Sequence, residues 1–213
     1  MNRSSLIYLH GFASGPGSQK AQYFRERFAD YGVEMTIPDL AAGDFSGLTI
    51  TGQLRVIEQA AKTRTVTLLG SSMGGYLAAL YAARHAEVER VVLMAPAFGF
   101  ARRWAQTLDP EKLAEWRRTG YLEMYHYGEK RPLPVSYRLI EDGSDYEDYP
   151  HVVQPALILH GAHDEVVPVA YSQEFAAGRP NVRLKVYDSG HELLNVLEQM
   201  WVEIRQFCTI MAS

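Results

Sequence analysis

Short apolar runs alternate along the chain with stretches whose apolar residues recur every three or four positions. The runs predict strands, and the period of about 3.6 residues predicts helices with one buried face. Six strands are predicted, at Leu6–Leu9, Val33–Ile37, Val66–Leu69, Val91–Met94, Ala156–Leu159 and Val182–Val186. Four of these runs are almost continuously apolar, which is typical of central parallel strands covered on both faces. The more mixed runs, Val33–Ile37 and Val182–Val186, are expected nearer the edges of the sheet.

The intervals between the strands carry helical periodicity. Two apolar faces follow it, formed by Ala21, Phe24, Phe28 and Tyr31 and by Ile50, Leu54, Ile57 and Ala61. Ser18 is the predicted N-cap of the first of these helices. The stretch Met73–His85 is rich in glycine and alanine, which allows a helix to pack close to a sheet, and a last helix is predicted over about Leu193–Phe207. Strands that alternate with helices indicate an α/β fold with a doubly wound, mainly parallel sheet of about six strands.

One long segment, residues 98–150, interrupts this alternation. It is rich in aromatic residues, among them Trp104, Trp116, Tyr121, Tyr125, Tyr127 and Tyr137. The alternation over Tyr121–Tyr127 suggests a β-hairpin, with Pro132–Pro134 in or near its turn. Long insertions in compact domains are usually functional. We therefore interpret residues 98–150 as a cap inserted into a single domain of residues 1–213; the alternative is an elaborated crossover that only packs on the core.

Composition and charge narrow the class of protein. The chain has 213 residues, 47% of them hydrophobic and 22% charged, which is ordinary for a globular domain. Its net charge of -4 and pI of about 6.0 argue against nucleic acid or an anionic membrane as the main partner. No stretch approaches the roughly 18 apolar residues of a membrane helix, and Leu6–Leu9 is too short for a signal sequence. The expected location is the cytoplasm.

The single cysteine, Cys208, excludes an intrachain disulfide and any metal site built on a cysteine pair. We expect it to be a buried apolar residue of the last helix. No metal or organic cofactor is implied by the sequence.

A G-x-S-x-G motif, Gly70-Ser71-Ser72-Met73-Gly74, follows one predicted strand directly and precedes a predicted helix. This strand-turn-helix setting is that of a nucleophile elbow, in which the serine adopts a strained backbone conformation and side chains at the glycine positions would clash. Ser72 is then expected at the C-terminal edge of the sheet, where the helix N-terminus and the Met73 N–H can stabilise an oxyanion. The alternative is a tight turn without chemistry.

A serine nucleophile needs a base and an orienting carboxylate, in the chain order Ser, Asp or Glu, His. Asp164 follows the predicted strand Ala156–Leu159, and His191 follows the next strand. Adjacent strand ends should bring both side chains near Ser72. Glu165 and Asp188 are the alternative carboxylates for this role. His10, His160 and His163 also lie at strand ends, and each is expected to be structural rather than the base. Asp188 is expected to brace the histidine loop, and His85, His126 and His151 have no motif around them.

The loop after the first strand is the candidate source of a second oxyanion donor. The Phe12 N–H is the candidate group, and Gly11 allows close backbone approach. The following Gly15–Lys20 stretch resembles a phosphate loop, but it fits neither the Walker pattern nor the dinucleotide pattern. Nucleotide binding is therefore the less favoured interpretation.

These motifs together resemble the α/β-hydrolases, and most of all the small YqiA-type bacterial esterases. The resemblance rests on Tyr8–Phe12 with Lys20-Ala21, Gly70–Tyr76, Asp164-Glu165-Val166 and Gly190-His191, and it is weak over 98–150. It implies an ester or thioester hydrolase that works through an acyl-enzyme. It also implies that the usual two antiparallel N-terminal strands are absent.

The expected protein is thus a carboxylesterase-like serine hydrolase, with Ser72 as nucleophile, His191 as base and Asp164 as the carboxylate that orients it. Its expected partner is a small-molecule ester or thioester, with neither nucleic acid nor membrane, and it is expected to be a monomer or homodimer. The candidates for substrate contacts are His10, Gly11, Trp104 and Tyr125. Two alternatives stay open, a serine peptidase of the same fold and a catalytically silent binding protein.

Overall fold

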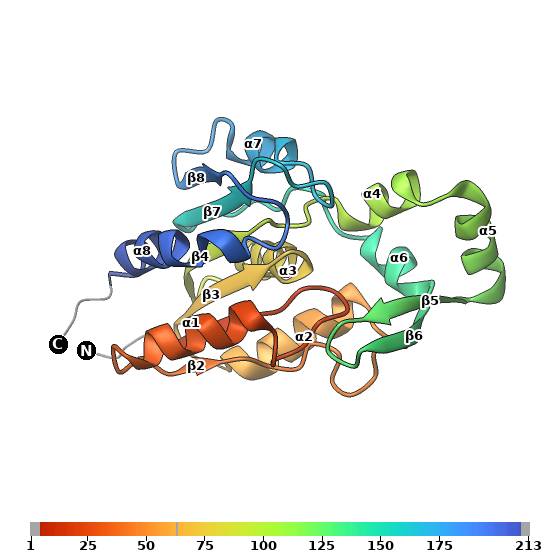
Figure 1. Ribbon diagram of the computed structural model, residues 1–213, viewed down its shortest axis with the longest axis horizontal. Coiled ribbons are helices and arrows are strands. Elements are labelled where there is room, and N and C mark those ends of the chain that lie inside the picture. Colours follow the sequence, from red (N-terminus) through yellow and green to blue (C-terminus); the bar gives the residue numbers. More distant parts are fainter. Residues whose placement is uncertain (1–4, 63, 210–213) are drawn as a thin grey trace.

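A six-stranded parallel sheet forms the centre of the protein (Figure 1). The computed structural model describes residues 5–62 and 64–209. The strands of this sheet are β1 (Ser5–Leu9), β2 (Met35–Thr36), β3 (Val66–Ser71), β4 (Val88–Met94), β7 (Ala156–Gly161) and β8 (Val182–Tyr187). Their spatial order is β2-β1-β3-β4-β7-β8, and every neighbouring pair is parallel. The predicted doubly wound sheet is confirmed, with the two mixed runs at its edges.

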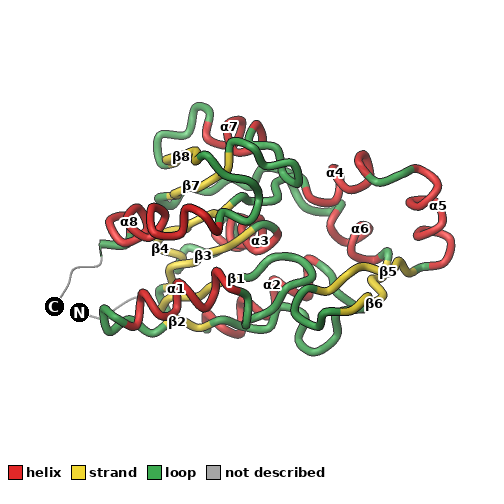
Figure 2. Tube along the Cα trace, in the orientation of Figure 1, coloured by secondary structure: helices red, strands yellow, loops and turns green. Residues whose placement is uncertain are grey.

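Helices cover both faces of the sheet. Alternate residues of each central strand point to opposite sides, so each strand contributes apolar side chains to a core on either face. In β7, Leu157 and Leu159 belong to one hydrophobic core, whereas Ala156 and Ile158 belong to the other. The first core includes residues of α1 (Gln19–Ala29) and α8 (Leu197–Phe207). The second includes residues of α2 (Ile50–Ala61), α3 (Met73–Ala82) and α7 (Ala170–Ala176). Figure 2 shows the same layers, with strands between helices.

Two predicted helix boundaries differ from the structure. The last helix begins at Leu197 rather than Leu193, because Leu193 adopts a left-handed conformation with φ of 56° and a 3-10 turn, η1 (Leu194–Val196), follows it. The first helix ends at Ala29, so Tyr31 lies beyond it. Ser18 is the N-cap residue of α1, as expected, yet its side chain makes no capping hydrogen bond within the described part of the chain.

Residues 98–150 leave the sheet after β4 and return before β7. They form α4 (Phe100–Thr107), α5 (Pro110–Thr119), β5 (Tyr121–His126), β6 (Arg131–Ser136) and α6 (Arg138–Gly143). The antiparallel pair β5–β6 confirms the hairpin suggested by the sequence. Pro132 and Pro134 lie within β6, and Pro132 is its second residue, so the prolines begin near the turn, as expected. A two-stranded ribbon allows prolines within a strand, because the outward edge of each strand needs no N–H donor.

Cys208 follows the last residue of α8 and is partly buried. Burial raises the pKa of its thiol to about 12, which suits a packing residue rather than a reactive one. No helix in the ranges 5–62 and 64–209 has both the length and the apolar character needed to cross a membrane.

Candidate active site

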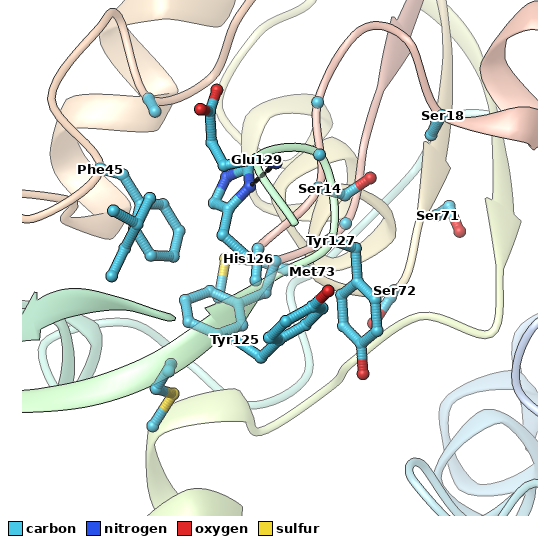
Figure 3. Close-up of a pocket in the computed structure, with 18 of the residues that line it drawn as sticks. Ser14, Ser18, Phe45, Ser71, Ser72, Met73, Tyr125, His126, Tyr127 and Glu129 are labelled. Atoms are coloured by element: carbon cyan, nitrogen blue, oxygen red, sulfur yellow. Dashed lines mark hydrogen bonds between the residues drawn. The ribbon is translucent and has the colours of Figure 1, made fainter. Parts of the chain in front are cut away.

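A cleft of about 1860 Å³ lies where the carboxyl ends of the central strands meet residues 98–150. The loop after β1, Ser71–Met73 at the end of β3, and His191 in the loop after β8 form part of its wall. The hairpin β5–β6 lines it as well, and Figure 3 shows Tyr125, His126 and Tyr127 around the same pocket as Ser72. The cleft therefore brings the predicted nucleophile and the aromatic segment together.

Ser72 occupies a strained turn between β3 and α3. Its φ of 54° and ψ of -118° lie in a region that residues other than glycine seldom adopt. Backbone hydrogen bonds hold the turn: the Ser72 N–H donates to the Met94 carbonyl at 2.8 Å, and the Ser72 carbonyl accepts from the Ala97 N–H at 3.0 Å. The strand-turn-helix arrangement predicted for this motif is thus present.

The glycines of the motif permit backbone contacts that a side chain would block. A Cβ atom on Gly70 would lie 2.2 Å from the Gly74 carbonyl oxygen. A Cβ atom on Gly74 would lie 2.1 Å from the Leu9 carbonyl oxygen. Both distances are far below van der Waals contact, so the close approach of α3 to β1 and β3 requires glycine at these positions.

A chain of hydrogen bonds links Ser72, His191 and Asp164. The Ser72 hydroxyl lies 3.0 Å from His191 Nε2, and His191 Nδ1 lies 2.8 Å from Asp164 Oδ2. An ionised carboxylate only accepts, so Nδ1 carries the proton and Nε2 is left to accept from the hydroxyl. The three residues come from the ends of β3, β8 and β7, as the sequence predicted.

Asp164 is buried and accepts hydrogen bonds from several donors. Its Oδ1 accepts from the Val166 and Val167 N–H groups at 2.9 and 2.7 Å. Its Oδ2 lies 3.0 Å from His160 Nε2, in addition to the contact with His191. Burial raises the pKa of the carboxyl, but hydrogen bonds from His160, His191 and Val167 outweigh burial and hold that pKa well below its usual value.

His160 therefore helps to hold Asp164, a contact that the sequence pattern does not predict. The side chain is fully buried, and its Nδ1 lies 2.7 Å from the Ser172 hydroxyl. The expectation that His160 is structural agrees with this geometry. A signal was present in the sequence, since His160 lies near the end of the predicted strand and precedes Asp164 by only four residues.

The competing carboxylates lie elsewhere. Glu165 is exposed, and Asp188 pairs with the exposed His163 at 2.9 Å. The Asp188–His163 contact joins the loop after β7 to the loop after β8. Asp188 thus braces the histidine loop, as expected, through His163 rather than through His191.

The backbone N–H groups of Phe12 and Met73 lie close to Ser72. Neither has a hydrogen-bond partner among the described residues. Both residues line the cleft. Gly11 brings the first of them near, because a Cβ atom on Gly11 would lie 3.4 Å from Ser72 Cβ. The two groups predicted as oxyanion donors are therefore both free to donate.

Three of the four predicted substrate contacts, Gly11, Trp104 and Tyr125, line the cleft, but the described lining does not include His10. His10 is buried, and its Nε2 accepts from the Leu40 N–H at 3.2 Å while Nδ1 lies 3.0 Å from the Gly11 carbonyl. Burial lowers the pKa of the His10 imidazole, although the hydrogen bond with the Gly11 carbonyl opposes this shift. The expectation of a substrate contact is corrected, because backbone groups occupy both ring nitrogens of His10.

Within the described ranges, no cluster of three or more His, Cys, Asp or Glu side chains has an arrangement that could hold a metal ion.

Comparison with known proteins agrees with the architecture. The chain is 27% identical to a 2-hydroxymuconate semialdehyde hydrolase of Pseudomonas putida, over 87% of this chain and 79% of that protein. An inferred hydrolase from Agrobacterium vitis S4 superposes with a TM-score of 0.83 at 27% identity, covering 97% of this chain and 88% of that one. Mouse alpha/beta hydrolase domain-containing protein 10 has a TM-score of 0.80 at 20% identity, covering 96% and 89%, and this likeness concerns the fold.

These likenesses support a general hydrolase function on an α/β-hydrolase fold. The family model described as "Uncharacterised protein family (UPF0227)" matches residues 5–209. The chain therefore belongs to the UPF0227 family, within the α/β-hydrolases.

Proposed function

We propose that the protein is a serine hydrolase that cleaves carboxylic esters or thioesters through an acyl-enzyme. The observation that carries the proposal is the hydrogen-bonded chain from Ser72 through His191 to Asp164, with separations of 3.0 and 2.8 Å, at a strained strand-turn-helix. This constellation is the one that serine nucleophiles use on several unrelated folds.

In the proposed reaction, His191 Nε2 takes the proton of Ser72 as its oxygen attacks the substrate carbonyl. The negative charge of Asp164 stabilises the imidazolium that forms. His191 then returns the proton to the leaving oxygen or sulfur, which leaves an acyl group on Ser72. Water repeats the two steps, releases the acid and restores the Ser72 hydroxyl.

The oxyanion formed in each half-reaction needs donors placed in advance. The N–H groups of Phe12 and Met73 are the proposed donors, since neither has a partner among the described residues and both line the cleft. Each such donor is worth about 2.7–4 kcal/mol of barrier in known hydrolases. The positive end of the α3 dipole adds to the field at Met73.

Residues 98–150 are the proposed cap, which shapes the substrate site. Trp104 meets Phe12 edge to face, with ring centroids 5.0 Å apart. The Tyr127 N–H at the hairpin tip donates to the Ala13 carbonyl at 2.8 Å, which joins the hairpin to the loop that carries Phe12. An aromatic cap in direct contact with that loop favours substrates with an apolar acyl or aryl group.

The test combines turnover with covalent labelling. Purified protein and the Ser72→Ala variant are assayed against p-nitrophenyl acetate, butyrate and octanoate, and each is treated with a fluorophosphonate followed by mass spectrometry. We expect turnover by the unaltered protein, label on Ser72, and a loss of about 10⁴-fold or more in kcat in the variant.

The alternatives predict other outcomes. Cleavage of peptide amides in preference to esters and thioesters would indicate a serine peptidase. A folded protein that neither turns over any of these substrates nor takes the label on Ser72 would contradict the enzyme and favour a silent binding protein.

A further inference from the structure

Lys20 is a buried cation in the wall of the cleft. It is the second residue of α1, its side chain is 8% exposed, and it lines the same cleft as Ser72 and His191. Among the residues described, its ammonium has no hydrogen bond and no ion pair. The Nζ atom is not among the fully buried polar atoms that lack a partner, so the ammonium reaches the cleft while the rest of the side chain is covered. A largely desolvated cation that no side chain contacts is available to an anionic ligand.

The other cations that line the cleft differ from Lys20 in this respect. Arg103 is also buried, but it donates to the Phe98 and Val166 carbonyls at 3.0 and 3.1 Å, which ties α4 to the loop after β7. Lys130 and Arg131 are exposed on the hairpin. Lys20 thus combines burial with an unused charge, and no structural contact accounts for it.

The surroundings of Lys20 add further donors. Ser18, the N-cap residue of α1, lines the cleft and leaves its hydroxyl unused as a cap within the described chain. Figure 3 shows Ser18 around the same pocket as Ser14, Ser71 and Ser72. The first turn of α1 contributes N–H groups that no helical carbonyl can accept, and the positive end of its dipole.

The charges of Glu192 and Asp164 act on the Lys20 ammonium. Burial lowers the pKa of Lys20, whereas these two carboxylates oppose that shift and favour the charged form. Asp164 is occupied by His191 and His160, and Glu192 is exposed beside His191. The ammonium therefore lies near the reacting groups without being neutralised by a direct contact.

We propose that Lys20, the Ser18 hydroxyl and the N-terminal turn of α1 form a subsite for an anionic group, a carboxylate or phosphate, on the ester or thioester that Ser72 attacks. The inference deepens the proposed function and rests on it. It narrows the substrate class from apolar esters to esters that carry a negative charge as well as an apolar part.

Binding is tested first, because it does not depend on turnover. Adipate and inorganic phosphate are titrated separately into Ser72→Ala protein by calorimetry at low ionic strength. The same titrations use a variant that also carries Lys20→Met, which keeps the length of the side chain and removes its charge. The control adds Lys112→Met instead, on the exposed face of α5, with the same change in net charge.

We expect at least one of the two anions to bind and its Kd to rise about tenfold or more with Lys20→Met, but not with Lys112→Met. Preference for adipate would identify a carboxylate, and preference for phosphate a phosphorylated substrate. No binding of either anion, or equal binding to the Lys20→Met protein in its folded state, would overturn the proposal.

Turnover provides the second arm. The ratio of kcat/KM for mono-p-nitrophenyl adipate to that for uncharged p-nitrophenyl hexanoate is measured with Ser72 intact. We expect Lys20→Met to lower this ratio about tenfold and Lys20→Arg to restore part of it. Ser72-dependent turnover with a ratio unaffected by Lys20→Met would overturn the anionic subsite and leave the proposed function standing. Absence of all turnover and of label on Ser72 would contradict the proposed function itself.

Discussion

His160 and Asp164 are joined by a buried contact of 3.0 Å between Nε2 and Oδ2, on the same carboxylate oxygen that His191 approaches. His160 Nε2 also lies 2.8 Å from the Val167 carbonyl oxygen. Both neighbours only accept, so Nε2 carries the proton and Nδ1 accepts from the Ser172 hydroxyl. His160 is therefore a positioning residue for Asp164 rather than a second base.

Replacing His160 by Phe should lower kcat by about tenfold to 100-fold, because a hydrogen bond to a charged group is worth about 1.5–3 kcal/mol. Ester turnover and urea denaturation are measured together. Ser172→Ala is the matched control, since it removes only the partner of Nδ1 and should have the smaller effect on kcat. Full kcat in a stably folded His160→Phe protein would contradict the positioning role.

Asp164 should make stability depend on pH in the acid range. Its pKa is lowered in the folded protein, chiefly by hydrogen bonds that outweigh burial, so the folded state binds the proton less readily than the unfolded state. The contribution is fully present above the usual value of 3.8 and is lost as the pH falls below it, towards the folded pKa. Asp164→Asn should remove this part of the pH dependence.

The free energy of unfolding, measured in urea between pH 3 and pH 7, tests this expectation. Asp145→Asn is the control, because Asp145 is exposed and its side chain makes no hydrogen bond in the described structure. It should leave the acid slope as it is in the unaltered protein. An acid slope that survives in Asp164→Asn would show that other carboxyl groups cause it.

The motif around Ser72 should tolerate no Cβ atom at Gly74. Gly74→Ala would bring a methyl group 2.1 Å from the Leu9 carbonyl oxygen, in backbone that cannot move independently. We expect a loss of about 3 kcal/mol or more in the free energy of unfolding. Gly17→Ala, where a Cβ atom meets nothing within 4 Å, should change stability by less than about 0.5 kcal/mol. Equal denaturation midpoints for the two variants would contradict the packing argument.

The arrangement of the sheet was predictable, whereas the contacts inside the loops were not. Apolar runs fix which segments are strands, and parallel strands place their carboxyl ends at one edge, so Ser72, Asp164 and His191 could be expected together. Side-chain direction in irregular loops follows no period. For this reason His10 was expected in the cleft although both its ring nitrogens meet backbone groups, and the contact of His160 with Asp164 was missed.

The environment of Lys20 is likewise not predictable from the sequence. The sequence places it after a Gly-rich loop at the start of a helix, where it contributes to the hydrolase resemblance and does not fit the nucleotide-binding patterns. Its significance depends on burial in the cleft wall and on the absence of a partner among the described residues, neither of which periodicity can reveal.

The hairpin offers a comparison between two tyrosines that tests whether the cap selects the substrate. Tyr125 and Tyr121 both belong to β5 and are similarly exposed, at 51% and 56%. Tyr125 lines the cleft and meets Tyr127 edge to face at 5.4 Å, whereas the lining of the cleft within the described residues does not include Tyr121.

If the cap binds the apolar part of the substrate, Tyr125→Ala should raise KM for p-nitrophenyl octanoate about threefold to tenfold, since an exposed aromatic contact is worth about 0.5–1.5 kcal/mol. KM for the acetate ester, whose acyl group is much shorter, should change less. Tyr121→Ala should leave both KM values as they are. If the two alanine variants shift KM equally, the hairpin acts through folding of residues 98–150 rather than through contact with the acyl chain.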